Sequence, residues 1–246
     1  MSNSENTKLP ENLRLSFVGC GVMAESIVAG LLRQKLVAPE QVSASHPREN
    51  RRRELLDKYG IASFQHNREA VENLPEQDAI AVLCVKPQRL KGVLTELNGA
   101  ISTHQTVVSI IAGAKIETFA EALNNQKIVR TMPNTPSQIG AGMTAWTCTE
   151  SVNDNERNNI KLLLGALGNE IYVENENMID MATALSATGP TYVFMVMEAL
   201  TDAGVHLGFS RHVSQELVQQ TILGSVKFAM ESGKHPAELR NMVTSP

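Results

Sequence analysis

The stretch that most constrains the fold runs over Leu13–Leu32 and reads LRLSFVGCGVMAESIVAGLL. An apolar run, Leu15–Val18, leads into a G-x-G-x-x-A turn, and a helical apolar pattern follows at once. This succession suits a dinucleotide pyrophosphate, because the glycines permit a tight turn and close backbone approach while the helix N-terminus offers free N–H groups. An ordinary strand–helix turn is the alternative. The residues predicted to bind the dinucleotide are Gly19, Cys20, Gly21, Val22, Met23 and Ala24.

Composition and cysteine usage narrow the class of protein. The chain has 246 residues, 42% of them hydrophobic and 20% charged, with a net charge of −4, which is typical of a globular protein. This balance predicts no general attraction to nucleic acid or to an anionic membrane surface. The N-terminal residues are polar, no apolar run reaches membrane-spanning length, and Cys20, Cys84 and Cys148 lack a metal-ligand spacing. We therefore expect a cytoplasmic protein with reduced thiols and no metal site.

Hydrophobic patterns divide the chain into two parts. Residues 1–12 resemble a disordered tail, and residues 13–150 alternate apolar β-rich runs with helical patterns, which predicts a parallel sheet with right-handed crossovers. Residues 151–246 are predicted to be all-helical, since no strand pattern stands out beyond Ile171–Val173. The expected strands are Leu15–Val18, Val42–Ala44, Ala79–Val85, Thr106–Ile111, Ile128–Thr131 and Met143–Trp146.

The helical part carries much apolar surface. A long helix is expected from Gly189-Pro190 to about Gly204, because proline is tolerated in the first helical turn, and another over Arg211–Met230. A helical unit this apolar usually packs against a partner, so we expect a homodimer.

A polar stretch follows the expected strand Val42–Ala44. Dinucleotide-binding folds usually place an acidic residue there to bind the free ribose 2′-hydroxyl of NADH, but this stretch contains Ser45, His46 and Arg48 and no acid. Serine and histidine can hydrogen-bond a 2′-phosphate and arginine can neutralise it, so the stretch favours NADPH over NADH. A solvated turn with a helix N-cap is the alternative.

Other candidate residues follow further expected strands, at the sheet edge where open α/β sheets bind ligands. Lys86 follows the run Ala79–Val85 and is expected to face the nicotinamide end of the cofactor. Ala112 and Gly113 are small enough to let a ring or a ribose approach the backbone, and Asn134 presents polar atoms from a loop stiffened by two prolines. A surface lysine, a helix-start turn and a rigid connector are the respective alternatives.

The run Leu185–Pro190 offers a second kind of site. A glycine-proline helix start exposes N–H groups that suit a carboxylate, and Ser186 and Thr188 add hydroxyl groups. A helix N-cap without a ligand is the alternative. No Cys/His, His/Glu or Ser-His-Asp arrangement stands out, so the sequence identifies no catalytic residue.

Several motifs occur in a fixed order, namely the glycine turn, VKPQ, SIIAGA, VRTMPNTP, SATGP and NMVTSP. Together they resemble pyrroline-5-carboxylate reductase over residues 13–246. The resemblance implies an α/β fold, with a Rossmann-type NAD(P)-binding domain over residues 13–150 and a helical substrate and dimerisation domain over residues 151–246. It implies dimers that often assemble into decamers. The implied reaction is hydride transfer from NADPH to the C=N carbon of 1-pyrroline-5-carboxylate, giving L-proline in the last step of proline biosynthesis.

The resemblance also implies roles for single residues. His46 and Asn67 would lie on the adenosine side of the cofactor, and Glu176 would belong to the substrate site, with a solvated acid at a helix start as the alternative. A cyclic imine is activated by protonation at nitrogen, so the enzyme needs mainly to hold it against the nicotinamide and anchor its carboxylate. The residues implied on the nicotinamide side are Cys84, Val85, Lys86, Pro87, Ala112 and Gly113.

The sequence departs from the family pattern in two places. It reads SATGPTY where the family more often reads SGSGPAY, and it stops at Ser245-Pro246, where the family continues into a Gly-Gly-Thr-Thr stretch that holds the substrate carboxylate. We count Ser245 as a substrate-binding residue and expect a C-terminally truncated or naturally short chain. The alternative functions are a truncated chain that binds cofactor and dimerises without turnover, and a reductase of another small cyclic imine. NADH is an alternative cofactor.

Overall fold

The computed structural model describes residues 8–244. The chain divides into two compact units, with the boundary between Gly189 and Pro190. We expected the division near residue 150, but the first unit continues through a further helix, a strand and a short helix before it ends.

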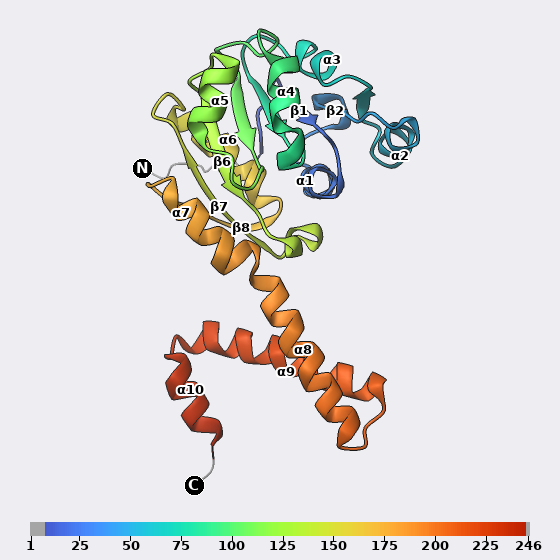
Figure 1. Cartoon of the computed structure of the whole chain (residues 1–246), viewed down its shortest axis with the longest axis vertical. Helices are drawn as coiled ribbons and strands as arrows, with labels where there is room; N and C mark the ends of the chain where they lie inside the picture. The colour runs from blue at the N-terminus through green and yellow to red at the C-terminus, as the bar shows by residue number, and fades with distance from the viewer. Residues whose placement is uncertain (1–7, 245–246) are drawn as a thin grey trace. The chain divides into compact units, whose positions relative to one another are not determined.

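An eight-stranded sheet forms the centre of the first unit, in the order β3-β2-β1-β4-β5-β6-β7-β8 (Figure 1). Neighbouring strands from β3 to β6 are parallel, in the strand order of a dinucleotide-binding sheet, as predicted. The order reverses between β1 and β4, where such sheets bind their ligands. The strands are β1 (Arg14–Val18), β2 (Val42–Ser45), β3 (Ala62–Phe64), β4 (Ala79–Leu83), β5 (Thr106–Ser109), β6 (Ile128–Met132), β7 (Gly142–Cys148) and β8 (Gly168–Tyr172).

The edge of the sheet beyond β6 differs from the expectation. Strand β7 runs antiparallel to β6, and β8 pairs in parallel with β7, so a part of the chain predicted to be all-helical adds a strand to the sheet. Gly142 and Gly168 are paired in register, and a Cβ at Gly168 would lie 2.3 Å from the carbonyl oxygen of Gly142. The first pair of this edge therefore requires a glycine at position 168.

Helices cover both faces of the sheet. Alternate residues of β4 separate the two cores, with Ile80 and Val82 on one face and Ala81 and Leu83 on the other. Residues of α1, α2 and α6 belong to the first core, and residues of α3, α4 and α5 to the second. The helices are α1 (Val22–Arg33), α2 (Glu49–Tyr59), α3 (Asn67–Glu72), α4 (Leu90–Leu97), α5 (Ile116–Leu123), α6 (Asp154–Gly165) and α7 (Asn177–Ala182), which a π-helical turn (Thr183–Ala187) follows.

The N-terminal segment is packed where the structure describes it. Leu9 is only 4% exposed and belongs to the first core, and Gln41 donates hydrogen bonds from Nε2 to the carbonyl oxygens of Pro10 and Leu13. The expectation of a disordered tail is therefore wrong for residues 8–12, because Leu9 supplies an apolar side chain that the polar pattern concealed.

The second unit contains the helices α8 (Gly189–His206), α9 (Arg211–Ser232) and α10 (Pro236–Val243), close to the predicted helical spans. Within its described residues, 190–244, only Thr201 and Ser214 are buried, and large apolar side chains such as Phe194 and Phe228 are more than half exposed. No helix in residues 8–244 is long and apolar enough to cross a membrane. The unit thus has almost no core of its own.

Candidate functional site

The glycine turn between β1 and α1 has the geometry that a dinucleotide requires. Gly19 has φ +83°, and a Cβ there would lie 2.5 Å from Cγ1 of Val85. A Cβ on Gly21 would meet nothing within 4 Å, and Gly21 caps α1 without a side-chain hydrogen bond. The turn therefore needs glycine at 19 for the fold and leaves open space at 21, next to the free N–H groups of the first helical turn.

Backbone hydrogen bonds bring the ends of β1, β2 and β4 together. The Cys20 N–H donates to the Ser45 carbonyl oxygen, and the Cys84 N–H donates to the Val18 carbonyl oxygen, both at 2.9 Å. The sequence-predicted residues on these segments therefore share one edge of the sheet. Burial raises the pKa of the Cys20 thiol to about 12 and holds that of Cys84 well above its usual range, so both are neutral thiols that fill space.

A chain of hydrogen bonds holds the turn from one side. The Gly19 N–H donates to Ser45 Oγ at 3.0 Å, and this hydroxyl donates to Asn67 Oδ1 at 2.7 Å. The Asn67 side chain in turn donates from Nδ2 to Oε2 of Glu96 at 2.7 Å. Ser45 binds the backbone of the turn directly, and Asn67 supports it by binding Ser45.

In the stretch after β2, one arginine side chain, that of Arg48, has no hydrogen-bonding or ion-pair partner among residues 8–244. The Arg48 guanidinium is exposed and makes no hydrogen bond or ion pair within residues 8–244, whereas Arg52 donates to the backbone carbonyls of His46 and Pro47 at 2.9 Å. Burial, together with the nearby charge of Arg48, lowers the pKa of His46, which is therefore neutral at neutral pH. Arg48 and His46 together offer a charge and a hydrogen bond to an anion.

Glu25 in the first turn of α1 has its charge fully matched. It forms an ion pair with Arg51, accepts a hydrogen bond from Lys58 at 2.9 Å, and accepts another from the Tyr59 hydroxyl at 2.7 Å. Burial opposes ionisation of Glu25, but these hydrogen bonds outweigh it and lower the pKa of its carboxyl to about 2. The cluster fixes α1 against α2 and engages Arg51 and Lys58, whereas Arg48 has no partner among residues 8–244.

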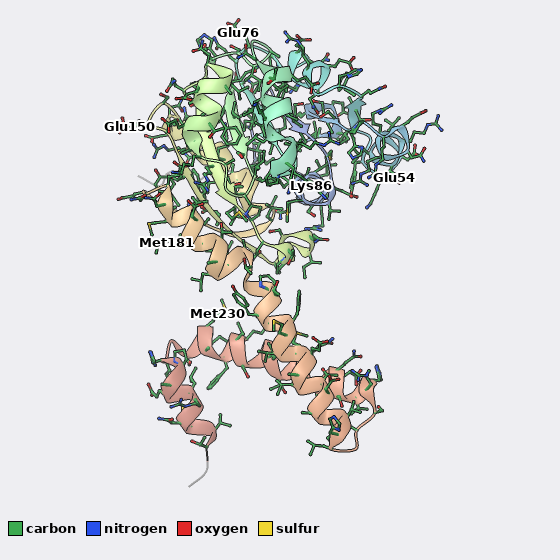
Figure 2. The ribbon with its side chains drawn as sticks, in the orientation of Figure 1. Glu54, Glu76, Lys86, Glu150, Met181 and Met230 are labelled. Carbon is green, nitrogen blue, oxygen red and sulfur yellow. The ribbon has the colours of Figure 1, made fainter. Side chains whose placement is uncertain are left out.

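The residues predicted for the nicotinamide side lie on loops after β4 and β5. Lys86 is exposed, with no side-chain partner within residues 8–244 (Figure 2). Ala112 and Gly113 are also exposed, and Gly113 has φ +73° with nothing within 4 Å of the position of a Cβ. Open space lies over this backbone, as a close approach by a ring would require.

The proline-bounded loop after β6 is folded by its own contacts. Asn134 accepts a hydrogen bond from the Met143 N–H at 2.9 Å and donates to the Ser186 carbonyl oxygen at 3.4 Å. Residues Thr135–Ile139 form a 3-10 helix within the loop that two prolines were expected to stiffen. The Thr188 hydroxyl donates to the Thr183 carbonyl oxygen at 2.9 Å, which closes the π-helical turn. These contacts join Asn134 to the segment that carries Ser186.

Arg130 and Asp180 join the site although the pattern analysis did not select them. Arg130 on β6 has a side chain only 2% exposed, and it pairs with Glu176 at 2.9 Å and with Asp180 at 2.5 Å. The same Glu176 oxygen, Oε1, accepts the Ile116 N–H at 2.7 Å. Glu176 is thus held at the start of α5, directly after the loop that contains Ala112 and Gly113. The sequence did contain a signal for Arg130, because a charged residue within the apolar run IVRT indicates a buried charge that needs a partner.

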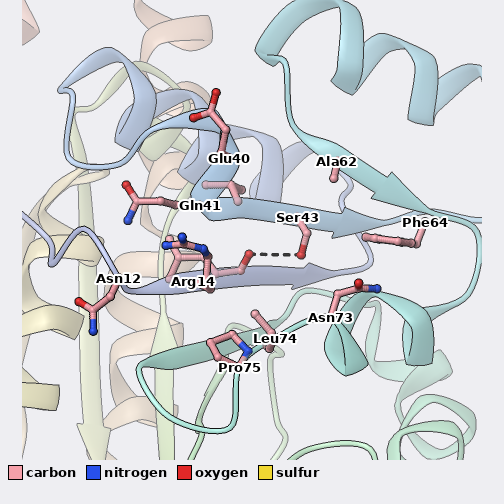
Figure 3. A pocket seen from close by; sticks show the side chains of 12 residues that line it. Asn12, Arg14, Glu40, Gln41, Ser43, Ala62, Phe64, Asn73, Leu74 and Pro75 are labelled. Atoms are coloured by element: carbon pink, nitrogen blue, oxygen red, sulfur yellow. Dashed lines mark hydrogen bonds between the residues drawn. The ribbon is translucent and has the colours of Figure 1, made fainter.

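A separate cavity of about 510 Å³ lies near the beginning of β1 and β2 (Figure 3). Several polar side chains that line the cavity already donate hydrogen bonds to the backbone. Arg14 donates to the Glu11 carbonyl oxygen, Gln41 donates to the Pro10 and Leu13 carbonyl oxygens, and Ser43 donates to the Leu15 carbonyl oxygen. The cavity lies away from the carboxyl ends of the strands and is distinct from the predicted cofactor site.

Ser245 lies outside the described residues. Within residues 8–244 no group of three or more His, Cys, Asp or Glu side chains could hold a metal ion.

Comparisons with known proteins agree with this geometry. Residues 176–246 match the family model of pyrroline-5-carboxylate reductase dimerisation, and residues 14–113 match the model described as NADP oxidoreductase coenzyme F420-dependent. The chain is 38% identical to the pyrroline-5-carboxylate reductase of Synechocystis, over 96% of this chain and 86% of the relative.

Solved structures give the same picture. A pyrroline-5-carboxylate reductase from Coxiella burnetii superposes with a TM-score of 0.86 at 32% identity, covering 96% of this chain and 86% of that one. The pyrroline carboxylate reductase of Plasmodium falciparum with NADP bound superposes with a TM-score of 0.84 at 29% identity, with the same coverage.

Proposed function

The chain belongs to the pyrroline-5-carboxylate reductase family and catalyses the reduction of pyrroline-5-carboxylate in proline biosynthesis, and on this premise we propose that NADPH is its preferred hydride donor. When bound, NADPH supplies the hydride that reduces the C=N bond. The observation that carries the proposal is the glycine turn, with open space at Gly21 and free N–H groups at the start of α1. A pyrophosphate needs both features.

The preference for NADPH over NADH rests on the stretch after β2. The last residue of β2 is Ser45, whose hydroxyl is engaged by Gly19 and Asn67. The next three residues, His46, Pro47 and Arg48, include no acid to bind a free 2′-hydroxyl. Arg48 supplies a positive charge that has no partner in the described part of the chain, and His46 supplies a neutral imidazole. A 2′-phosphate would complement both groups.

The protein positions the two reactants. We assign Lys86 and the Ala112-Gly113 backbone to the nicotinamide side, and Glu176, Ser186 and Thr188 to the substrate. Two contacts support this arrangement: Glu176 is bound to the N–H of Ile116, just after Gly113, and Asn134 is bound to the carbonyl of Ser186. Orienting a protonated imine against the cofactor accounts for the catalysis without a strong acid–base pair.

The dimerisation match implies that the chain forms a homodimer. The exposed apolar side chains of α8 and α9 support an interface built from these helices. Assembly of dimers into decamers and a cytoplasmic location are further parts of the proposal.

The test is steady-state oxidation of NADPH and then NADH with DL-pyrroline-5-carboxylate, with proline identified as the product. We expect turnover with both donors and a higher kcat/KM with NADPH. An equal or higher kcat/KM with NADH would refute the proposed preference. Arg48→Gln should raise KM for NADPH about tenfold and leave KM for NADH unchanged, since one charge-assisted contact to a phosphate is lost.

A further inference from the structure

A carboxylate on α4 ends the hydrogen-bond chain that starts at the glycine turn. Glu96 accepts the Asn67 N–H at 2.9 Å and the Asn67 side-chain amide at 2.7 Å, and it accepts the Arg68 N–H at 3.3 Å. The N-cap residue of α3, His66, makes no side-chain cap hydrogen bond. Glu96 therefore caps α3 from a neighbouring helix while it also binds the side chain of the first residue of α3.

The charge of Glu96 determines which way the side-chain amide of Asn67 points. A carboxylate only accepts hydrogen bonds, so it requires the NH₂ group of Asn67 and turns the amide oxygen toward Ser45. The Ser45 hydroxyl then donates to this oxygen and keeps a lone pair for the Gly19 N–H. Ser45 is fully buried, so each of these donors and acceptors depends on its partner.

We infer that Glu96 is a positioning residue for the cofactor, acting through Asn67 and Ser45 on the backbone of Gly19. Gly19 has φ +83°, and its N–H donates to Ser45 Oγ at 3.0 Å, a shorter side-chain contact with this turn than the 3.4 Å hydrogen bond from Arg51 Nε to the Cys20 carbonyl oxygen. The inference rests on the proposal that the turn binds the dinucleotide. Glu96 itself touches neither Ser45 nor Gly19 in any contact of the described residues, so its effect on the cofactor is indirect.

The substitution Glu96→Gln isolates this effect from capping. The glutamine oxygen can still accept the Asn67 N–H and cap α3, but the glutamine NH₂ group then faces the Asn67 NH₂ group. Relief of that clash turns the Asn67 amide over and presents a donor to Ser45, so the hydroxyl hydrogen of Ser45 loses its acceptor. A hydroxyl that no longer donates is a weaker acceptor, so the bond from the Gly19 N–H weakens. Loss of a negative charge alone would have the opposite sign, because it would favour an anionic cofactor.

The experiment is a double-mutant cycle in the full chain with Glu96→Gln, Ser45→Ala and both together. The dissociation constants of NADPH and NADH are measured by fluorescence titration, and kcat, KM and melting temperature are measured for each protein. Glu69→Gln is the matched control, because Glu69 is an exposed glutamate on α3 whose side chain has no hydrogen bond or ion pair within residues 8–244.

We expect Glu96→Gln and Ser45→Ala each to weaken both cofactors about tenfold, with kcat at saturating cofactor unchanged within about twofold. The double variant should bind no more weakly than Ser45→Ala alone, and the control should match the parent. Unchanged cofactor affinity in Glu96→Gln, or additive losses of about a hundredfold in the double variant, would overturn the inference. A parent that preferred NADH would refute only the proposed donor, because the cycle is measured with both cofactors.

Discussion

Gly19 and Val85 lie so close that a Cβ on Gly19 would be 2.5 Å from Cγ1 of Val85. This contact joins the end of β1 to the end of β4, across the point where the strand order reverses. The turn that we propose to bind the cofactor is therefore also a packing contact of the sheet, and its two glycines should respond differently to substitution.

Gly19→Ala should destabilise the fold and weaken cofactor binding, because alanine at φ +83° is strained by about 1–3 kcal/mol even before the clash with Val85. Gly21→Ala should leave the melting temperature unchanged, since Gly21 has φ −83° and open space around the Cβ position, yet it should weaken NADPH binding by more than tenfold. Thermal unfolding and NADPH titration of both variants make the comparison. Equal losses of stability would contradict this account.

Arg130→Met should lower the free energy of unfolding by about 1–3 kcal/mol, because it leaves the partly exposed carboxylates of Glu176 and Asp180 without their buried hydrogen-bonding partner. The matched control is Arg53→Met, which removes an exposed ion pair with Glu49 and should cost less than about 1 kcal/mol. Urea unfolding measures both. If the two variants unfold alike, the buried arginine has no special role in holding α7 to the sheet.

Acid should destabilise the protein through Glu25. The folded pKa of about 2 lies below the ordinary value of 4.5, so the carboxylate contributes stability that is complete above pH 4.5 and is lost as the pH falls toward 2. The side chain is 19% exposed, and the contribution should be roughly 2–3 kcal/mol. Glu25→Gln should flatten this part of the stability–pH curve, whereas Glu49→Gln should leave it unchanged. Parallel curves for the parent and Glu25→Gln would argue against the cluster.

The thiols near the cofactor site should be unreactive in the folded protein. Burial raises the pKa of Cys20 to about 12 and that of Cys84 well above its usual range, so neither supplies thiolate at pH 8. Iodoacetamide labelling followed by mass spectrometry should modify both residues in urea and neither in buffer. Rapid labelling of Cys20 in buffer would mean that the turn opens readily.

Phe228→Asp should break the homodimer. Phe228 on α9 is 52% exposed within the chain, and a carboxylate in an apolar interface is strongly disfavoured. Lys227→Gln, at the neighbouring position, is the control and should remain dimeric. Light scattering after size exclusion gives the mass of each. A dimeric Phe228→Asp variant would place the interface elsewhere.

The features that the sequence predicted well are local. The strand, turn and helix around Gly19 are contiguous, and the expected strands fall on observed strands because continuous apolar runs identify buried parallel strands. β3 was missed because it has only three residues. β8 was recognised only at its end, as the pattern Ile171–Val173, because its residues are mostly exposed and lack a clear apolar pattern.

The missed site residues depend on tertiary packing. The capping of α3 by Glu96 joins residues 29 positions apart and leaves no local pattern. Arg130 did leave a signal, since a charged residue inside an apolar strand requires a buried partner, but its partners lie 46 and 50 positions away. A charge in a strand therefore predicts that a partner exists without identifying it.

The scarcity of buried side chains in residues 190–244 has a thermodynamic consequence. A segment in which only Thr201 and Ser214 are buried within the described chain cannot offset the conformational entropy of ordering its helices. Its folding must then be linked by mass action to association, so the free energy that holds these helices depends on protein concentration. Dilution should lower the melting temperature of this part of the molecule, while the sheet of the first unit, with its two cores, should melt independently of concentration.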